Sequence, residues 1–258
     1  MSALGLSFLL HSCKEEFDYN QITEGLERLV VEGYITDLDS VHTIKLMLSS
    51  DFIDPQQAIA VSGAVVTVSD GANLFTFTET EPGIYKNVQF FKGETGKTYS
   101  LSVAYNSETY TAQSKMNPCF EIDTAAVFWE DEMNYVLMSG QEHNDPGQFY
   151  ILKTTINGVL NDTLANWSYF SDELLNGIYF NFELVALFEG DETDSVSISL
   201  FSVSKEFFSY YASIVNNTGY EPDPFFSTTP ANFKGNISNG ALGFFLVSSV
   251  KKKSCVRF

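Results

Sequence analysis

The fold is decided by two adjoining segments near the start of the chain, Leu29–Thr36 (LVVEGYIT) and residues 41–48 (VHTIKLML). In the second segment the apolar side chains of Ile44, Leu46 and Leu48 alternate with the side chains between them. This period of two residues is typical of a β-strand with one buried face. The two segments therefore predict the first two strands of a β-rich fold.

Further strands are expected at close spacing after this pair. Asp70-Gly71 and Asn106-Ser107 are tight-turn signals between neighbouring strands. Short strands with turn residues between them predict a β-sandwich of immunoglobulin or transthyretin type over residues 28–116. Its remaining expected strands cover residues 64–68, 74–78, 83–88, 98–105 and 109–112.

A second β-rich domain is expected over residues 117–258, after the break at Asn117-Pro118. Residues 189–193 join two of its strands and are rich in acidic side chains, which predicts an acidic-tipped hairpin. Residues 160–176 show no readable pattern. The expected strands of this domain cover residues 124–129, 134–139, 148–156, 177–188, 194–201 and 243–250.

One helix is predicted in the second domain, near residues 205–216. Ser204 can cap its first turn, and a polar stretch ending in Gly219 closes it. Aromatic side chains such as Phe207 and Tyr211 fall on one side of the helix. This stripe predicts packing against a sheet, and a platform for a ligand is the alternative.

The chain is strongly acidic. Its 33 acidic residues outnumber 14 basic ones, which gives a net charge of −19 over 258 residues. Such a charge repels nucleic-acid backbones and anionic lipid headgroups. We therefore expect no nucleic-acid partner and no electrostatic adhesion to membranes.

Residues 1–12 are interpreted as a secretory signal peptide whose recorded start is shortened. The apolar run Ala3 to Leu10 has the length of a signal-peptide core and is far shorter than the roughly 20 residues of a membrane-spanning helix. Ser12 directly precedes Cys13, which resembles the bacterial lipoprotein cleavage site, where the cysteine thiol accepts a diacylglycerol. A buried N-terminal strand with an incidental cysteine is the alternative.

The residues after Cys13 are expected to form a lipidated tether, residues 13–27. Lys14, Glu15 and Glu16 resemble the short charged signal that takes lipoproteins of Bacteroidota to the outer face of the outer membrane. The expected location is therefore the outer membrane, with a lipid anchor and the protein on the extracellular face.

A family resemblance spans nearly the whole chain. It is carried by Leu29–Thr36, by Gly83-x-Tyr85 with Gly96-x-x-Tyr99, and by the late run at residues 230–245. Together these resemble the Bacteroidota lipoprotein family labelled domain of unknown function 4249, and the first part also resembles carboxypeptidase regulatory-like modules. The resemblance implies an accessory surface protein beside a TonB-dependent receptor, and it implies no established chemistry.

Motifs of common enzymes are missing from the sequence. It contains no nucleophile elbow, no zinc-protease helix and no phosphate-binding glycine loop. Beyond the leader only His42 and His143 could supply a histidine base, and His42 reads as a strand-end residue held by backbone. The prediction is a protein that is no enzyme and holds no cofactor.

Two weaker site candidates remain. The acidic residues Glu189, Asp191, Glu192 and Asp194 could offer oxygen ligands to calcium, although a solvated loop tip is the plainer interpretation. A disulfide between Cys119 and Cys255 would suit an oxidising compartment, and two separate buried thiols are the alternative.

The sequence thus predicts a surface lipoprotein that acts by binding, as an accessory that helps a TonB-dependent receptor capture a nutrient or peptide. The alternatives are a surface adhesin or structural lipoprotein and, further off, a glycan hydrolase. A groove lined by exposed Trp and Tyr would favour capture of carbohydrate or peptide.

Overall fold

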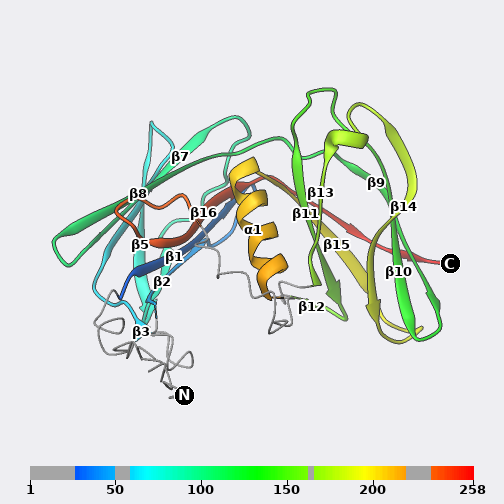
Figure 1. Cartoon of the computed structure of the whole chain (residues 1–258), viewed down its shortest axis with the longest axis horizontal. Coiled ribbons are helices and arrows are strands. Elements are labelled where there is room, and N and C mark those ends of the chain that lie inside the picture. The colour runs from blue at the N-terminus through cyan, green and yellow to red at the C-terminus, as the bar shows by residue number, and fades with distance from the viewer. Residues whose placement is uncertain (1–26, 50–58, 162–165, 219–233) are drawn as a thin grey trace, which may run out of the picture.

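A computed structural model describes residues 27–49, 59–161, 166–218 and 234–258 (Figure 1). The chain is mainly β, with three sheets and, in these described ranges, one α-helix. This confirms the mainly β prediction. Figure 1 shows the first sheet on the left, the other two on the right and the helix α1 (Lys205–Thr218) between them.

The first sheet forms what we call the first body. It has nine strands in the order β16-β1-β2-β6-β5-β4-β7-β8, with β3 beside β2. Its end strands meet, because the amide of Val247 donates to Ser114 Oγ at 3.0 Å. The strands are β1 (Leu29–Thr36), β2 (Thr43–Leu48), β3 (Ile59–Ala60), β4 (Val65–Ser69), β5 (Leu74–Glu81), β6 (Ile84–Asn87), β7 (Thr98–Tyr105), β8 (Glu108–Lys115) and β16 (Leu242–Ser248).

The predicted alternation builds the core of this body. On β7 the side chains of Tyr99, Leu101 and Val103 are buried, and the serines between them are not. The β7–β8 turn uses Asn106 and Ser107 with φ of 50° and 64°, a left-handed pair that joins two antiparallel strands tightly. These strands and this turn confirm the sequence-based prediction.

The division into consecutive domains at residue 117 fails at one strand. β16 was expected in the second domain, but it lies parallel to β1 in the first sheet, with Val30 opposite Leu242 and Ile35 opposite Val247. Phe245, fully buried, belongs to the core of the first body. The side chain of Asn236 holds this strand in place, since it accepts from the Phe245 amide at 2.9 Å and donates to its carbonyl at 2.8 Å.

The second body contains two sheets that enclose one core. One sheet has the order β14-β10-β9-β18, and the other β12-β11-β15-β17 with β13 beside β11. Val136 and Met138 from the first of these pack with Leu152 and Leu200 from the second. The strands are β9 (Ile122–Glu130), β10 (Met133–Gln141), β11 (Phe149–Ile156), β12 (Val159–Leu160), β13 (Ser168–Ser171), β14 (Tyr179–Glu189), β15 (Val196–Val203), β17 (Val250–Ser254) and β18 (Val256–Arg257).

The expected acidic-tipped hairpin is wrong. β14 pairs with β10 and β15 pairs with β11, so the loop between β14 and β15 crosses from one sheet to the other. Alternation of apolar residues identifies a strand and one buried face, but it does not say which neighbour the strand pairs with. Two strands that follow one another in the sequence can therefore have the pattern of a hairpin and still belong to different sheets.

The predicted helix is present as α1. Ser204 caps it, because its Oγ accepts from the Phe207 amide at 3.2 Å. Phe207 and Tyr211 are buried in a cluster with Phe244 and Leu246 of β16. The stripe is therefore core, as predicted, and α1 packs against strands of both bodies. Among the described residues, no helix combines the length and the apolar character that crossing a membrane requires.

Candidate functional site

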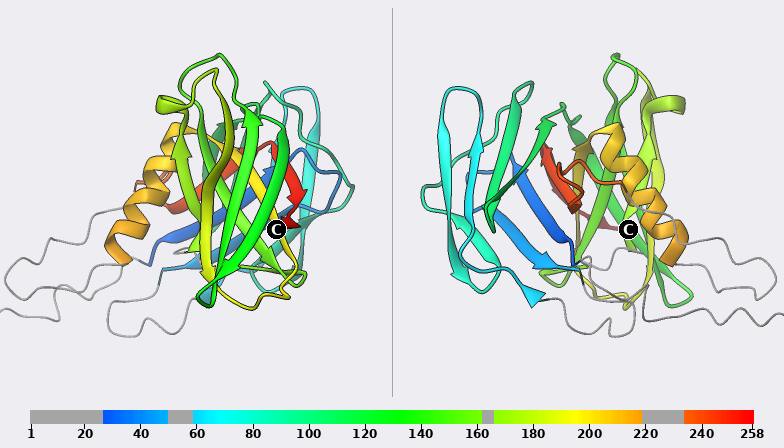
Figure 2. Two further views of the ribbon diagram at one scale, coloured as in Figure 1. Left: turned by 90° about the vertical axis from the view of Figure 1, so that its right-hand side faces the viewer. Right: turned by 60° about the vertical axis from the view of Figure 1, so that its left-hand side comes forward.

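A cleft of about 500 Å³ lies between the two bodies, beside α1. Figure 2, right, shows α1 beside the second body with β1 and β2 of the first body to its side. The cleft needs both bodies, since β1 and β2 supply one wall, and β11, α1 and the segment before β13 supply the other. It is lined by Glu32, Tyr34, Thr36, Ser40, Val41, His42, Thr43, Lys45, Lys153, Leu160, Trp167, Phe207, Tyr210, Tyr211, Ile214 and Phe244.

Aromatic side chains dominate the wall of the cleft. The rings of Trp167 and Tyr211 stack with their centroids 5.6 Å apart and their planes 12° apart. The Tyr211 hydroxyl donates to the Trp167 carbonyl at 3.1 Å. Tyr34 meets Phe207 edge to face and remains 41% exposed. The wall thus combines rings fixed by packing with one ring that is open to solvent.

The charged groups of the cleft have defined places. Lys153 Nζ lies 3.3 Å above the centroid of the Trp167 ring, a cation–π contact. Burial raises the pKa of Tyr211 to about 12, and burial with the nearby Glu32 charge raises the pKa of Tyr210. Both phenols are therefore neutral hydroxyl groups at physiological pH. The cleft offers the exposed ring of Tyr34, hydroxyl groups, the carboxylate of Glu32 and the ammonium groups of Lys45 and Lys153, which suits binding.

His42 lines the cleft as a structural residue. It is 3% exposed, its Nε2 lies 2.9 Å from the Phe91 carbonyl, and its amide donates to Asn87 Oδ1 at 2.6 Å. Burial lowers the pKa of the imidazole, so the ring is neutral at physiological pH. The prediction of a strand-end histidine held by backbone is confirmed.

The acidic loop does not gather its carboxylates around one point. Asp194 uses its carboxylate for the chain itself, accepting from the Asp191 amide at 2.8 Å and from Asn157 Nδ2 at 2.7 Å. Arg257 donates to the Asp194 carbonyl at 2.7 Å. In the described ranges, no group of three or more His, Cys, Asp or Glu side chains could hold a metal ion. The calcium candidate Glu189, Asp191, Glu192 and Asp194 is thus a set of loop residues, with Asp194 as the loop's anchor.

Of the two possibilities for Cys119 and Cys255, the structure has the separate thiols, since both cysteines are free. The thiol of Cys119 lies 3.6 Å from the Leu200 carbonyl, whereas the amide of Cys255 donates to the Val196 carbonyl. These two carbonyls are four residues apart on β15, about 13 Å along a strand. The two cysteines therefore contact different parts of β15 and lie in the core of the second body as separate thiols.

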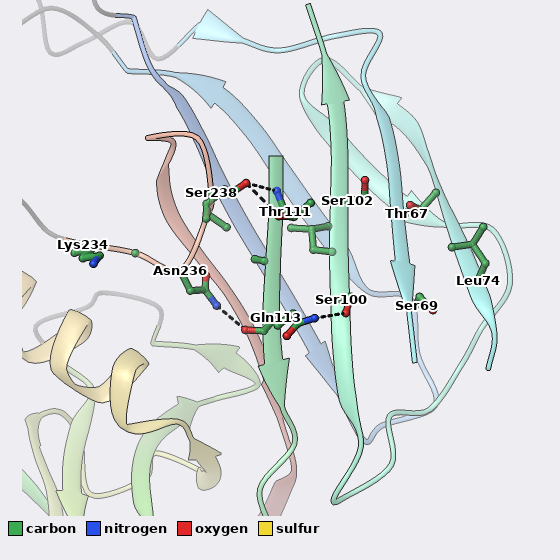
Figure 3. Close-up of a pocket in the computed structure, with 14 residues that line it drawn as sticks. Thr67, Ser69, Leu74, Ser100, Ser102, Thr111, Gln113, Lys234, Asn236 and Ser238 are labelled. Atoms are coloured by element: carbon green, nitrogen blue, oxygen red, sulfur yellow. Dashed lines mark hydrogen bonds between the residues drawn. The ribbon is translucent and has the colours of Figure 1, made fainter. Parts of the chain in front are cut away.

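A second hollow of about 710 Å³ lies on the first body (Figure 3). Hydroxyl groups of β4, β7 and β8 face it, among them Thr67, Ser102 and Thr111. Gln113 Nε2 donates to Ser100 Oγ at 3.2 Å and links two of these strands. Among the described residues, Lys234 is the only charged one in its lining, so this part of the hollow is nearly uncharged.

The sequence pointed to part of this arrangement. His42 and the helix stripe were singled out, but Trp167 lies in the stretch that had no readable pattern. Two aromatic residues close together, Trp167 and Tyr169, were the only sign of a packed segment there. The stretch has no strand or helix periodicity that would place them. Cys13, Lys14, Glu15 and Glu16, which carry the lipidation and export predictions, lie outside the described residues.

Comparison with known proteins identifies a family. No curated protein sequence matches the chain. The crystal structure of a DUF3823 family protein from Parabacteroides merdae ATCC 43184 is similar at 11% identity and a TM-score of 0.24, covering 68% of this chain and 91% of that chain. A likeness at this level says nothing about function. The family model described as domain of unknown function (DUF4249) matches residues 14–254, and the chain therefore belongs to the DUF4249 family.

Proposed function

We propose that this protein is a non-catalytic binding protein, anchored to the outer membrane by a lipid on Cys13 and exposed to the outside. There it helps a TonB-dependent receptor capture a nutrient or peptide. In this function the aromatic cleft holds the captured molecule, and the lipid keeps the cleft near the receptor.

The aromatic cleft is the observation that carries this proposal. Tyr34 supplies a ring that is 41% exposed above the buried, stacked rings of Trp167 and Tyr211. Glu32 and Lys153 supply opposite charges from the two walls. Sugar rings and aromatic or apolar peptide side chains bind through such surfaces, with polar groups fixing their orientation. The groups that line the cleft therefore suit recognition without a chemical step.

Isolation of the complex tests the receptor partnership. A tagged full-length protein, purified from outer membranes in mild detergent, is expected to bring a TonB-dependent barrel with it in a fixed ratio. The Cys13→Ser variant is expected to leave the membrane fraction and to lose the barrel. Repeated purification without a barrel, from membranes that hold the protein, contradicts the proposal.

A matched pair of variants tests the cleft. Tyr34→Ala removes a ring that is 41% exposed in the cleft, and Tyr179→Ala removes a ring that is 52% exposed on β14. Cells that carry Tyr34→Ala are expected to take up labelled oligosaccharide or oligopeptide mixtures several-fold more slowly, because stacking contributes about 0.5–1.5 kcal/mol per pair. Cells that carry Tyr179→Ala should match the wild type. Equal uptake by both variants would show that the cleft does not bind the captured molecule.

The hydroxyl-lined hollow supports the second candidate, a surface adhesin. Its rows of Ser and Thr hydroxyl groups, with Lys234 as the one charged residue of the described lining, suit the hydroxyl groups of an uncharged polymer. This function requires no receptor. Deletion of the protein would then leave nutrient uptake unchanged and alter attachment of cells to a surface.

A further inference from the structure

The sheet β14-β10-β9-β18 has two apolar faces. One face packs into the core of the second body through Val127, Val136 and Ala186. Residues directly opposite one another on neighbouring strands point to the same side of a sheet. Tyr135 is opposite both Phe128 and Leu187, so these three side chains point to the other side.

We call this other side the outer face. It also holds a second row across the sheet, in which Leu137 is opposite Ala126 and Leu184, and Ala126 is opposite Val256. Phe258 follows Val256 by two residues, which places its side chain on the same side, and its ring meets that of Phe182 with centroids 5.6 Å apart. The outer face is formed by Phe128, Tyr135, Leu137, Phe182, Leu184, Leu187, Val256 and Phe258.

The outer face is open to solvent. Leu184, Leu187 and Val256 are 54%, 50% and 55% exposed. None of its eight residues belongs to a core cluster of the described chain. A group of apolar side chains from four adjacent strands is larger than the scattered apolar residues of an ordinary surface, and such groups mark interaction sites.

Carboxylates border one end of the outer face. Met133 lies opposite both Glu130 and Glu189, so these two side chains point to the same side as the apolar rows, next to the row of Tyr135. Asp131 and Glu132 form the turn beside them. The partner that fits is therefore apolar in its centre and carries Lys or Arg at one border.

The charge argues against two other occupants of the outer face, a second copy of this chain and an anionic membrane surface. A second copy of the chain brings its own net charge of −19, and anionic lipid headgroups bring the same sign. Addition of a strand to the free edge of β14 is a third possibility. That edge is irregular, because the β10–β14 pairing shifts register between Val136 and Leu137 and again between Met138 and Gly140. Bulges of this kind twist an edge away from further strands.

We infer that the outer face docks a partner protein through an apolar surface bordered by basic side chains. The acidic end, with Glu130 and Glu189, sets the orientation of that partner, and the apolar rows supply the contact area. This surface is separate from the aromatic cleft, and the inference holds for any protein partner, whether or not that partner is a receptor.

Site-specific crosslinking of the full chain on intact cells tests the inference. A photoreactive phenylalanine analogue replaces Leu187 on the outer face or, as the control, Phe90, which is 67% exposed in the loop after β6 of the first body. The expected result is an adduct with one protein from position 187 and none from position 90. Mass spectrometry of the adduct should place Lys or Arg in the crosslinked peptide of the partner.

Charge reversal then tests the orientation. Glu130→Lys with Glu189→Lys is expected to lower the yield of the Leu187 adduct about tenfold at low ionic strength and less at high salt. Reversal of the exposed Glu81 and Glu108 of the first body, with the same change in net charge, should leave the yield unchanged. Circular dichroism confirms that the variants are folded.

Four results overturn the inference. They are equal adducts from positions 187 and 90, an adduct that contains only a second copy of this chain, an adduct that contains only lipid, and a yield that the reversal of Glu130 and Glu189 does not change. A protein adduct whose partner is no TonB-dependent receptor would support the inference and contradict the proposed receptor partnership. The two proposals can therefore fail separately.

Discussion

At the scale of single residues, Asp70 holds the β4–β5 turn. Its carboxylate accepts from the amides of Ala72 and Asn73 at 3.0 and 2.7 Å and from Lys97 Nζ at 3.2 Å, and its side chain is 4% exposed. These donors, the Asn73 amide first, hold the pKa of Asp70 well below its usual range. Asp70, which marks a turn in the sequence, thus also links β4 and β5 to the loop before β7 through its charged side chain.

We expect Asp70→Asn to lower the free energy of unfolding by about 1 kcal/mol at pH 7, because the charged hydrogen bonds are weakened. A carboxylate with a lowered pKa stabilises the fold above its unfolded pKa of about 4, and this stability is lost as the pH falls below that value. Urea unfolding should therefore show a difference from wild type that shrinks toward pH 3. The same change at the exposed Asp123 is the control, and a difference independent of pH would contradict the anchor role.

Cys119 and Cys255 give a second prediction at this scale. Burial raises the pKa of Cys119 to about 12 and that of Cys255 to about 11, so both thiols are protonated at pH 8. In a Cys13→Ser protein, iodoacetamide should label neither cysteine within the time that labels both in urea. Rapid labelling of native Cys119, measured by mass spectrometry, would show that the second body opens more readily than its packing implies.

At the scale of elements, the β1–β16 pairing depends on a glycine. Gly243 has a φ of 89°, and a Cβ there would lie 2.1 Å from the carbonyl oxygen of Val31. Gly240 has a φ of 71° with open space around the same position. The two glycines share a left-handed conformation and differ only in the closeness of the neighbouring strand.

We expect Gly243→Ala to cost more than about 3 kcal/mol of unfolding free energy, since β16 must move away from β1. Gly240→Ala should cost only about 1 kcal/mol, the penalty of the backbone conformation alone. Thermal unfolding of both variants measures the difference. Equal losses would mean that the close approach to Val31 contributes nothing.

At the scale of the whole molecule, the last residues of the chain join all three sheets. β16 completes the first sheet, β17 pairs with β15, and β18 pairs in parallel with β9. The amide of Val250 donates to Asp37 Oδ1 at 2.8 Å where the chain passes from one body to the other. The two bodies are therefore interleaved in sequence, although each has its own core.

This interleaving predicts the behaviour of a fragment. Residues 27–116 alone lack β16, and with it the fully buried Phe245 and Val247 of the first core. We expect this fragment to show no cooperative urea transition by circular dichroism, because one side of β1 and part of the core stay open. A peptide of residues 234–250 should restore the transition. A cooperative transition of the fragment by itself would contradict the dependence on β16.

The sequence by itself determined the local structure. The alternation on β2 and β7, the left-handed turn at Asn106-Ser107 and the cap at Ser204 are interactions within a few residues, which give the same answer in any surroundings. The buried place of His42 followed from its position on a strand face. The mainly β class and the family were therefore readable without coordinates.

Only the tertiary structure decided which of these elements meet. The pairing of β1 with β16 joins segments about two hundred residues apart, β14 and β15 separate into different sheets, and Trp167 reaches the cleft from a stretch without periodicity. Each of these contacts depends on which of several strands pairs with a given sheet edge and on how the side chains of the two cores pack together. That competition is settled by the packing of the whole chain, and so no local pattern in the sequence could encode the cleft or the outer face.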